Sequence, residues 1–368
     1  MSLVVDAVAH AYNLAPGNRA PAATADEFAA FRTALLGMHQ AWSDPAAACP
    51  PQAFVSTWDA ESLGATLFLQ SDTDIAVYHD TALTPVFKDG GSPLAVGARL
   101  AELYPGRVLL YAGVDATAGA RALEHMDRVV DDYEITGFKF YPVTGTYGPD
   151  GVAEGVLLND VHRMYPLLEH ARELGVRHIA IHKSVPFRRE SVDPYLNIND
   201  VDAPAVAFPD LTFEVVHAGF AFLEETAFLL ARHPNVYATL EISMNLVVRY
   251  PRRFARILGA LLAAAGPDRI LHATGCMLTH PQPVIEAFRA FEMPQDLVEE
   301  EGFPPVDHAV KEAILGGNAL RLYGLTDAAV FSHLADDHVS RWRAEHGRNA
   351  PWSRLPQPDV AAVGSVPQ

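Results

Sequence analysis

The most constraining feature of the sequence is a series of eight short apolar runs, most of which are followed by a stretch of helical periodicity. Most of the runs are continuously apolar rather than alternating, as is typical of strands that are buried on both faces of a parallel sheet. They span residues 3–10, 74–79, 107–114, 135–141, 178–182, 211–217, 236–242 and 269–274. Repeated alternation of strand and helix predicts an α/β fold, a (β/α)8 TIM barrel.

The length of 368 residues is compatible with one barrel domain and additional segments. We expect a catalytic barrel over residues 1–325 and a polar C-terminal extension over residues 326–368, which packs on the outside, exchanges with a neighbour or frays. Residues 12–58 form an insertion after the first strand, with a predicted helix over residues 26–38. Because barrel enzymes keep their active sites at the C-terminal ends of the strands, this insertion is a candidate lid.

Composition restricts the partners and the compartment. Hydrophobic residues make up 49% of the chain, enough for a large core, and the net charge of −18 argues against nucleic acid as a partner. The only two cysteines, Cys49 and Cys276, are far apart, which indicates a reducing compartment rather than a disulfide framework. No apolar run approaches the ~20 residues that span a membrane. The N-terminus begins with strand-like LVVDAV, so we expect no signal peptide and a cytoplasmic location.

Histidines close three of the predicted strands. His10 ends LVVDAVAH, His182 ends IAIH and His217 ends FEVVH, while Lys139 and Tyr141 lie at the end of GFKFYP. The C-terminal ends of parallel strands converge on one face of a barrel, so these side chains are expected to meet there. Imidazole groups bind metal ions and transfer protons near neutral pH. The pattern therefore predicts an enzyme active site that is assisted by a metal ion.

These motifs, together with GRVLLYAGVD, DRILHATG and ILGGNALRLYGL, resemble the amidohydrolase-related family, in the branch that contains aminocarboxymuconate semialdehyde decarboxylase and the resorcylate decarboxylases. The resemblance extends to about residue 325 and implies a barrel with a metal site. The first strand of the family ends in Asp-x-His-x-His, which is matched here by Asp6, Val8 and His10. Its last strand ends in a metal-contacting Asp, and Gly275 stands at that position. Two positions of the family's site therefore lack their functional group.

The resemblance implies that His10 and His182 bind one divalent ion, with zinc as the first choice. Two imidazoles alone make a weak site, so a third ligand is expected, either Glu241 at the end of the seventh predicted strand or Cys276. His217 binds the metal or handles protons. Two alternatives stay open: a metal-free enzyme that uses these histidines with Lys139 and Glu241, and a non-catalytic binding protein on the same scaffold.

The expected reaction is hydrolysis of a C–N or C–O bond in a small carboxylated or cyclic metabolite, because hydrolysis is the most common chemistry of the superfamily. The alternative is non-oxidative decarboxylation of an aromatic or enoic acid, the activity of the branch that the sequence resembles. The residues expected to be catalytic are His217, Glu241 and Lys139. Those expected to contact substrate are Lys139, Tyr141, Tyr12, Arg188 and His280. The resemblance also suggests a homodimer.

Overall fold

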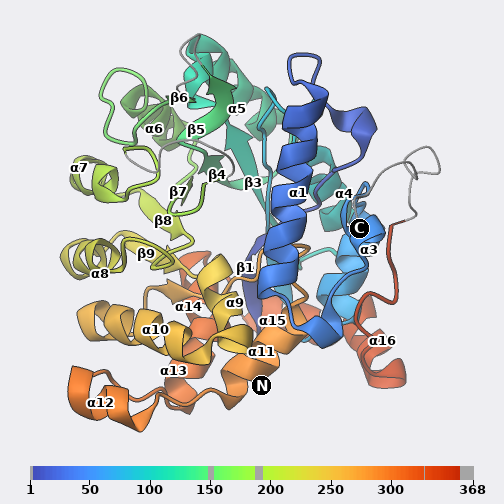
Figure 1. The fold of residues 1–368 in the computed structure, drawn as a ribbon, viewed down its shortest axis with the longest axis vertical. Coiled ribbons are helices and arrows are strands. Elements are labelled where there is room, and N and C mark those ends of the chain that lie inside the picture. Colours follow the sequence, from blue (N-terminus) through green and yellow to red (C-terminus); the bar gives the residue numbers. More distant parts are fainter. Residues whose placement is uncertain (1–2, 148–152, 187–193, 327, 357–368) are drawn as a thin grey trace.

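The protein is a barrel of parallel strands surrounded by helices (Figure 1), in a computed structural model that describes residues 3–147, 153–186, 194–326 and 328–356. The prediction of a (β/α)8 barrel is confirmed. The eight barrel strands, in the order in which they pair, are β1 Val5–Ala9, β2 Ile75–His79, β3 Val108–Val114, β4 Ile135–Phe140, β7 His178–His182, β8 Thr212–Val216, β9 Val236–Thr239 and β10 Ile270–Leu271. A separate antiparallel pair is formed by β5 Val143–Tyr147 and β6 Ala153–Gly155.

The first and last strands meet and close the barrel. A parallel bridge joins Ala9 to Cys276, and the amide of Gly275 donates to the carbonyl of Val8 over 3.0 Å. The carboxylate of Asp6 adds a side-chain link, because it accepts hydrogen bonds from the amide of Thr274 at 2.9 Å and from its hydroxyl at 2.5 Å. The seam therefore occupies Asp6, which the resemblance had placed beside the metal site.

The helices surround the barrel on its outside, and the insertion contributes the longest of those described. This helix, α1, begins with a capping box in which Thr24 and Glu27 satisfy each other's backbone amides, and it runs on beyond the predicted residues 26–38. None of the described helices is long and apolar enough to cross a membrane. The helices are α1 Ala25–Trp42, α2 Pro51–Phe54, α3 Ala60–Gly64, α4 Leu94–Leu103, α5 Ala120–Asp132, α6 Tyr165–Glu173, α7 Asp202–Ala207, α8 Leu223–Arg232, α9 Glu241–Arg249, α10 Pro251–Ala265, α11 Pro281–Ala290, α12 Gln295–Glu301, α13 His308–Glu312, α14 Asn318–Leu322, α15 Ala328–Ala335 and α16 His338–His346.

The strands contribute apolar side chains to two parts of the core. Val8, Val77 and Val216, from three different strands, belong to one buried group. Phe213 of β8 belongs to another, which also contains Leu229 of α8 and Leu258 of α10. This burial on both faces explains why the strands appear in the sequence as continuous apolar runs.

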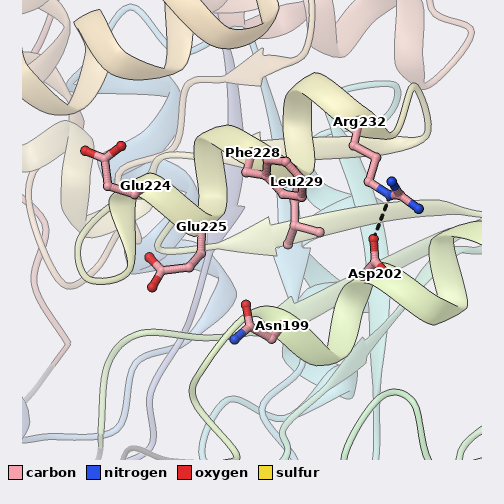
Figure 2. A pocket seen from close by; sticks show the side chains of 7 residues that line it. All are labelled: Asn199, Asp202, Glu224, Glu225, Phe228, Leu229 and Arg232. Carbon is pink, nitrogen blue, oxygen red and sulfur yellow. Dashed lines mark ion pairs between the residues drawn. The ribbon is translucent and has the colours of Figure 1, made fainter.

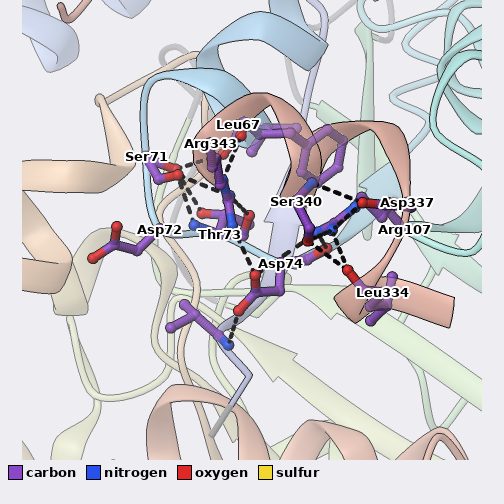
Figure 3. Close-up of polar contacts among 12 residues, drawn as sticks. Leu67, Ser71, Asp72, Thr73, Asp74, Arg107, Leu334, Asp337, Ser340 and Arg343 are labelled. Carbon is purple, nitrogen blue, oxygen red and sulfur yellow. Dashed lines mark hydrogen bonds and ion pairs between the residues drawn. The ribbon is translucent and has the colours of Figure 1, made fainter. Parts of the chain in front are cut away.

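The C-terminal segment packs against the barrel through the buried Arg107 and the partly buried Arg343 (Figure 3). Arg107 is fully buried and binds both carboxylate oxygens of Asp337, at 2.5 and 2.9 Å. Arg343 of α16 donates to Asp74 and to the carbonyl of Phe68, each over 2.9 Å. Further along, Trp352 is 7% exposed and donates from its indole to the carbonyl of Ala47 in the insertion.

Candidate functional site

A small cavity lies where the predicted catalytic residues meet at the C-terminal ends of the strands. Its volume is about 20 Å³, which accommodates roughly one water molecule. The insertion covers it, because Leu35 and Met38 of α1 form part of its wall. The residues that line it are His10, Tyr12, Leu35, Met38, Tyr141, His182, Val185, His217, Glu241, Ile242 and Leu278.

Strand register brings His182 and His217 together. The parallel pairing of β7 with β8 aligns His182 with Val216, so His217 follows directly at the same edge of the barrel. The Nε2 atom of His217 lies 3.1 Å from Nδ1 of His182. The other ring nitrogen of His182, Nε2, is 2.6 Å from the carbonyl oxygen of Val185. Both nitrogens of His182 are therefore engaged in hydrogen bonds.

The backbone at His217 is held in a strained conformation. Its φ of +63° lies in the left-handed region, which side chains other than glycine rarely adopt and which costs on the order of 1–3 kcal/mol. Such strain is maintained only where the surrounding structure enforces it, and it is often found at functional sites. At His217, the residue with this strained backbone has its imidazole in contact with both His182 and Glu241.

Glu241 lies opposite His217, but on a different element from the one predicted. The seventh strand, β9, ends at Thr239, and Glu241 is the first residue of α9. Its Oε2 atom lies 3.1 Å from Nδ1 of His217, and its side chain is almost completely buried. Burial raises the pKa of Glu241 above its ordinary value, against the lowering influence of the positive charge on Lys139. Burial also holds the pKa of His217 well below its usual range.

Lys139 supplies a buried positive charge next to the cavity. It is 1% exposed, it does not line the cavity, and its ammonium group lies 5.2 Å from the centre of the Tyr141 ring. Burial lowers the pKa of Lys139, while the carboxyl groups of Glu241 and Glu214 raise it. Glu214 accepts hydrogen bonds from the hydroxyls of Tyr111 at 2.5 Å and Tyr323 at 3.0 Å, and burial raises its pKa to about 7.

His10 is oriented by the neighbouring strand, and next to it lies a histidine that the sequence reasoning missed. Nδ1 of His10 donates to the carbonyl oxygen of His79 over 2.9 Å, which leaves its Nε2 unprotonated while the ring is neutral. Burial lowers the pKa of His10 to about 3. His79 is fully buried and stacks on Tyr111 with 4.7 Å between ring centres, and neither of its ring nitrogens has a hydrogen-bond partner among the residues that the structure describes. Its signal was the strand-ending sequence IAVYH, which parallels IAIH and FEVVH.

The structure brings most of the predicted site residues together. His10, Tyr12, Tyr141, His182, His217 and Glu241 all line the cavity. His280 instead caps the N-terminus of α11 and lies against Trp352, 4.9 Å between ring centres, outside the cavity wall. Cys276 is buried and does not line the cavity, so it is not placed as a third ligand. Arg188 lies outside the described residues.

The residues at the cavity do not form a ligand set for a divalent ion. Among the described residues, no three histidine, cysteine, aspartate or glutamate side chains are grouped in a way that would hold one. Val8 is packed in an apolar group, and both nitrogens of His182 are used by protein partners. A tetrahedral zinc site needs several free lone pairs that converge within roughly 2.3 Å of one point. Metal binding by His10 and His182 stays a prediction.

A larger hollow lies on the outer surface, between α7 and α8 (Figure 2). It has a volume of about 640 Å³ and is lined by Asn199, Asp202, Glu224, Glu225, Phe228, Leu229 and Arg232. Arg232 and Asp202 form an exposed ion pair across it, with 3.0 Å between Nε and Oδ1. None of its residues lies at the C-terminal end of a barrel strand, so the cavity at the strand ends is the candidate active site.

Several solved structures share the barrel fold of this protein but little of its sequence. The structure is similar to a TIM-barrel protein of uncharacterised function from Bordetella bronchiseptica, with a TM-score of 0.60, 17% identity, and coverage of 87% of this chain and 98% of that one. An amidohydrolase from Burkholderia multivorans with bound zinc gives a TM-score of 0.53, 16% identity, and coverage of 88% and 99%. A 5-carboxyvanillate decarboxylase from Novosphingobium aromaticivorans, solved with manganese and a nitrobenzoic acid derivative, gives a TM-score of 0.52, 14% identity, and coverage of 88% and 97%.

At these identities the similarity establishes the barrel fold and leaves the reaction open. No curated protein sequence matches the chain. The family model described as Amidohydrolase matches residues 90–325, which include β3 to β10 and with them Lys139, His182, His217 and Glu241. The match spans more than half of the sequence, and the chain therefore belongs to the amidohydrolase family.

Proposed function

We propose that this protein catalyses the non-oxidative decarboxylation of a small aromatic or enoic carboxylic acid. The observation that carries the proposal is the buried pair of His217 and Glu241 at the cavity wall, with 3.1 Å between Nδ1 and Oε2. Burial favours the neutral form of both groups, so a proton-bearing carboxyl group faces the reaction space near neutral pH. A general acid of this kind is what decarboxylation requires, because the carbon that loses the carboxylate must gain a proton.

In this mechanism Glu241 gives its proton to the substrate carbon that carries the carboxylate. The bond between that carbon and the carboxylate then breaks, its electron pair returns to the ring or double bond, and carbon dioxide leaves. Glu241 regains a proton from solvent, so one proton is consumed for each carbon dioxide released. Lys139 contributes a positive charge close to Tyr141 that attracts the substrate carboxylate. Tyr12 and Tyr141 provide aromatic walls for a planar substrate.

The similarity to a decarboxylase that was solved with a carboxylated aromatic molecule supports this choice of reaction over the hydrolysis that was the first expectation from the sequence. Hydrolysis of a C–N or C–O bond is retained as the second candidate, because the cavity has room for about one water molecule beside the Glu241 carboxyl group. In that case the ionised form of Glu241 would take a proton from the water, and the product would contain an oxygen atom from solvent.

The test is a screen of aromatic and α,β-unsaturated acids that carry an isotope label in the carboxyl group, with detection of labelled carbon dioxide. We expect carbon dioxide release, and we expect Glu241→Gln and His217→Asn to lower turnover by ~10²–10⁴-fold, the usual contribution of a general acid or base. Glu225→Gln, at an exposed position of α8, is the control and keeps full turnover. Uptake of labelled oxygen from solvent without release of carbon dioxide would favour the hydrolase instead.

A further inference from the structure

Gly275 creates the space that Glu241 occupies. A Cβ atom at residue 275 would overlap Oε1 of Glu241 and would lie only 3.0 Å from its Cγ and 3.1 Å from its Cδ. Real Cβ atoms almost never approach other heavy atoms so closely, so any side chain at this position would force Glu241 to move. The carboxyl group of Glu241 thus lies against the position where the resemblance places the aspartate of the last strand. Glu241 can therefore occupy its observed position only because residue 275 has no side chain.

The hydrogen bonds of His182 fix where its proton lies. The carbonyl oxygen of Val185 can only accept, so Nε2 of His182 must carry the hydrogen in the 2.6 Å contact. In the neutral ring Nδ1 is then an acceptor, and it receives the Nε2 hydrogen of His217 over 3.1 Å. No lone pair of His182 is left for a metal ion in this arrangement.

The same reasoning extends to His217 and Glu241. With its hydrogen on Nε2, the neutral His217 ring presents the lone pair of Nδ1, which has no hydrogen-bond partner among the described residues. Oε2 of Glu241 lies 3.1 Å from this atom, a distance at which a protonated carboxyl group can donate a hydrogen bond to it. The series of donors therefore points one way, from Glu241 through His217 and His182 to the carbonyl of Val185.

We infer that a hydrogen-bonded relay of Glu241, His217 and His182, which Gly275 makes sterically possible, replaces the divalent metal centre of the family in this protein. The relay deepens the proposed function and rests on it in taking this cavity as the reaction site. Glu241 touches the reaction space and is the catalytic acid, and its proton leaves the hydrogen bond to His217 when it is transferred to the substrate. His217 keeps the carboxyl group oriented, His182 fixes the tautomer of His217, and Gly275 is a positioning residue that acts through Glu241. The site then works without a divalent ion.

The first experiment uses the unaltered protein, purified without a histidine tag, and follows its isotope-labelled histidine side chains by NMR near neutral pH. His182→Gln and His217→Gln identify the two sets of signals. We expect both rings to be neutral with the hydrogen on Nε2, and we expect no change on addition of zinc chloride, manganese chloride or a chelator. Stoichiometric zinc binding with a shift of the His182 signals would overturn the inference.

The second experiment compares alanine substitutions at two glycines that both have positive φ. Gly275 and Gly266 both have positive φ, +64° and +66°, but a Cβ at Gly266 meets nothing within 4 Å. We expect Gly275→Ala to shift the His217 signals in the same direction as Glu241→Gln, while Gly266→Ala leaves them unchanged. Unchanged His217 signals in Gly275→Ala would overturn the positioning role of Gly275. If Gly275→Ala does not fold, the measurement on the unaltered chain still decides the inference.

Neither measurement requires turnover, so the inference and the proposed reaction fail separately. Carbon dioxide release that is abolished by a chelator and restored by manganese would leave decarboxylation standing and overturn the relay. An intact relay in a protein that releases no carbon dioxide from any acid in the screen would leave the relay standing and remove the proposed reaction.

Discussion

At the residue scale, the protein keeps several acids buried inside or at the mouth of the barrel. Glu241 was predicted from its place after an apolar run, and the structure brings it to His217. The sequence could not predict that the Glu241 side chain occupies the space left by Gly275. The two residues are distant in the chain and meet only when the barrel closes. The hydrogen bond of His182 to the carbonyl of Val185 could not be predicted either, because every residue type has a backbone carbonyl and its identity gives no sign of what it accepts.

A residue-scale prediction concerns Glu214, which is fully buried between the hydroxyls of Tyr111 and Tyr323. Burial raises the pKa of Glu214 from 4.5 to about 7, so between these values the unfolded chain releases this proton while the folded chain retains it. The free energy of unfolding therefore falls as the pH rises through this window, by up to roughly 3 kcal/mol from this group. Denaturant titrations of the wild type and Glu214→Gln at several pH values isolate the contribution as the difference between the two proteins. Parallel profiles would show that Glu214 does not titrate in this way.

At the element scale, all eight strands were predicted from their apolar runs, because burial on both faces requires that composition. The prediction was wrong at the end of the seventh strand, where LEIS continues the apolar pattern but the chain already turns into α9. Local periodicity cannot separate a buried strand end from a buried helix start. The helix of the insertion was also predicted, and the structure shows that two of its side chains form part of the cavity wall.

The matching prediction at this scale is that α1 is held in place by its apolar side chains. Leu35 is 2% exposed and contributes to the cavity wall, so Leu35→Ala is expected to cost about 2–5 kcal/mol of stability or to loosen α1 locally. Thr33→Ala, on the exposed face of the same helix, is the control and should change stability by less than about 0.5 kcal/mol. Hydrogen exchange of the α1 amides measures the local effect. Equal exchange in both variants, with equal stability, would contradict the role of Leu35.

At the scale of the whole molecule, barrel closure and the docking of the C-terminal segment were the least predictable features. The seam depends on Asp6 and Thr274, which are separated by most of the sequence. The polar composition after residue 325 left three outcomes open, namely packing on the outside, exchange with a neighbour, and fraying. In the structure Asp337 of this segment binds the buried Arg107 (Figure 3), and Trp352 is buried and donates a hydrogen bond to Ala47 of the insertion. The sequence of a polar segment does not indicate which of its charged residues will form a buried ion pair, or with which partner.

Removing one member of the buried ion pair tests this docking. Arg107→Met leaves the carboxylate of Asp337 buried without its partner and is expected to cost about 3–5 kcal/mol of stability. Arg341→Met breaks an exposed ion pair with Asp336 in the same region and should cost less than about 1 kcal/mol. Thermal or denaturant unfolding distinguishes the two. Equal losses would mean that the C-terminal segment contributes little to the folded state.

The size of the cavity has a kinetic consequence. A space for about one water molecule cannot admit an aromatic acid, so the conformation described here is not the one that first meets a substrate. Binding must then wait for part of the cavity wall to move, and the observed association rate should level off as ligand concentration rises instead of increasing in proportion. The plateau would give the rate at which the protein opens, a property of the unliganded chain that is independent of which acid it accepts.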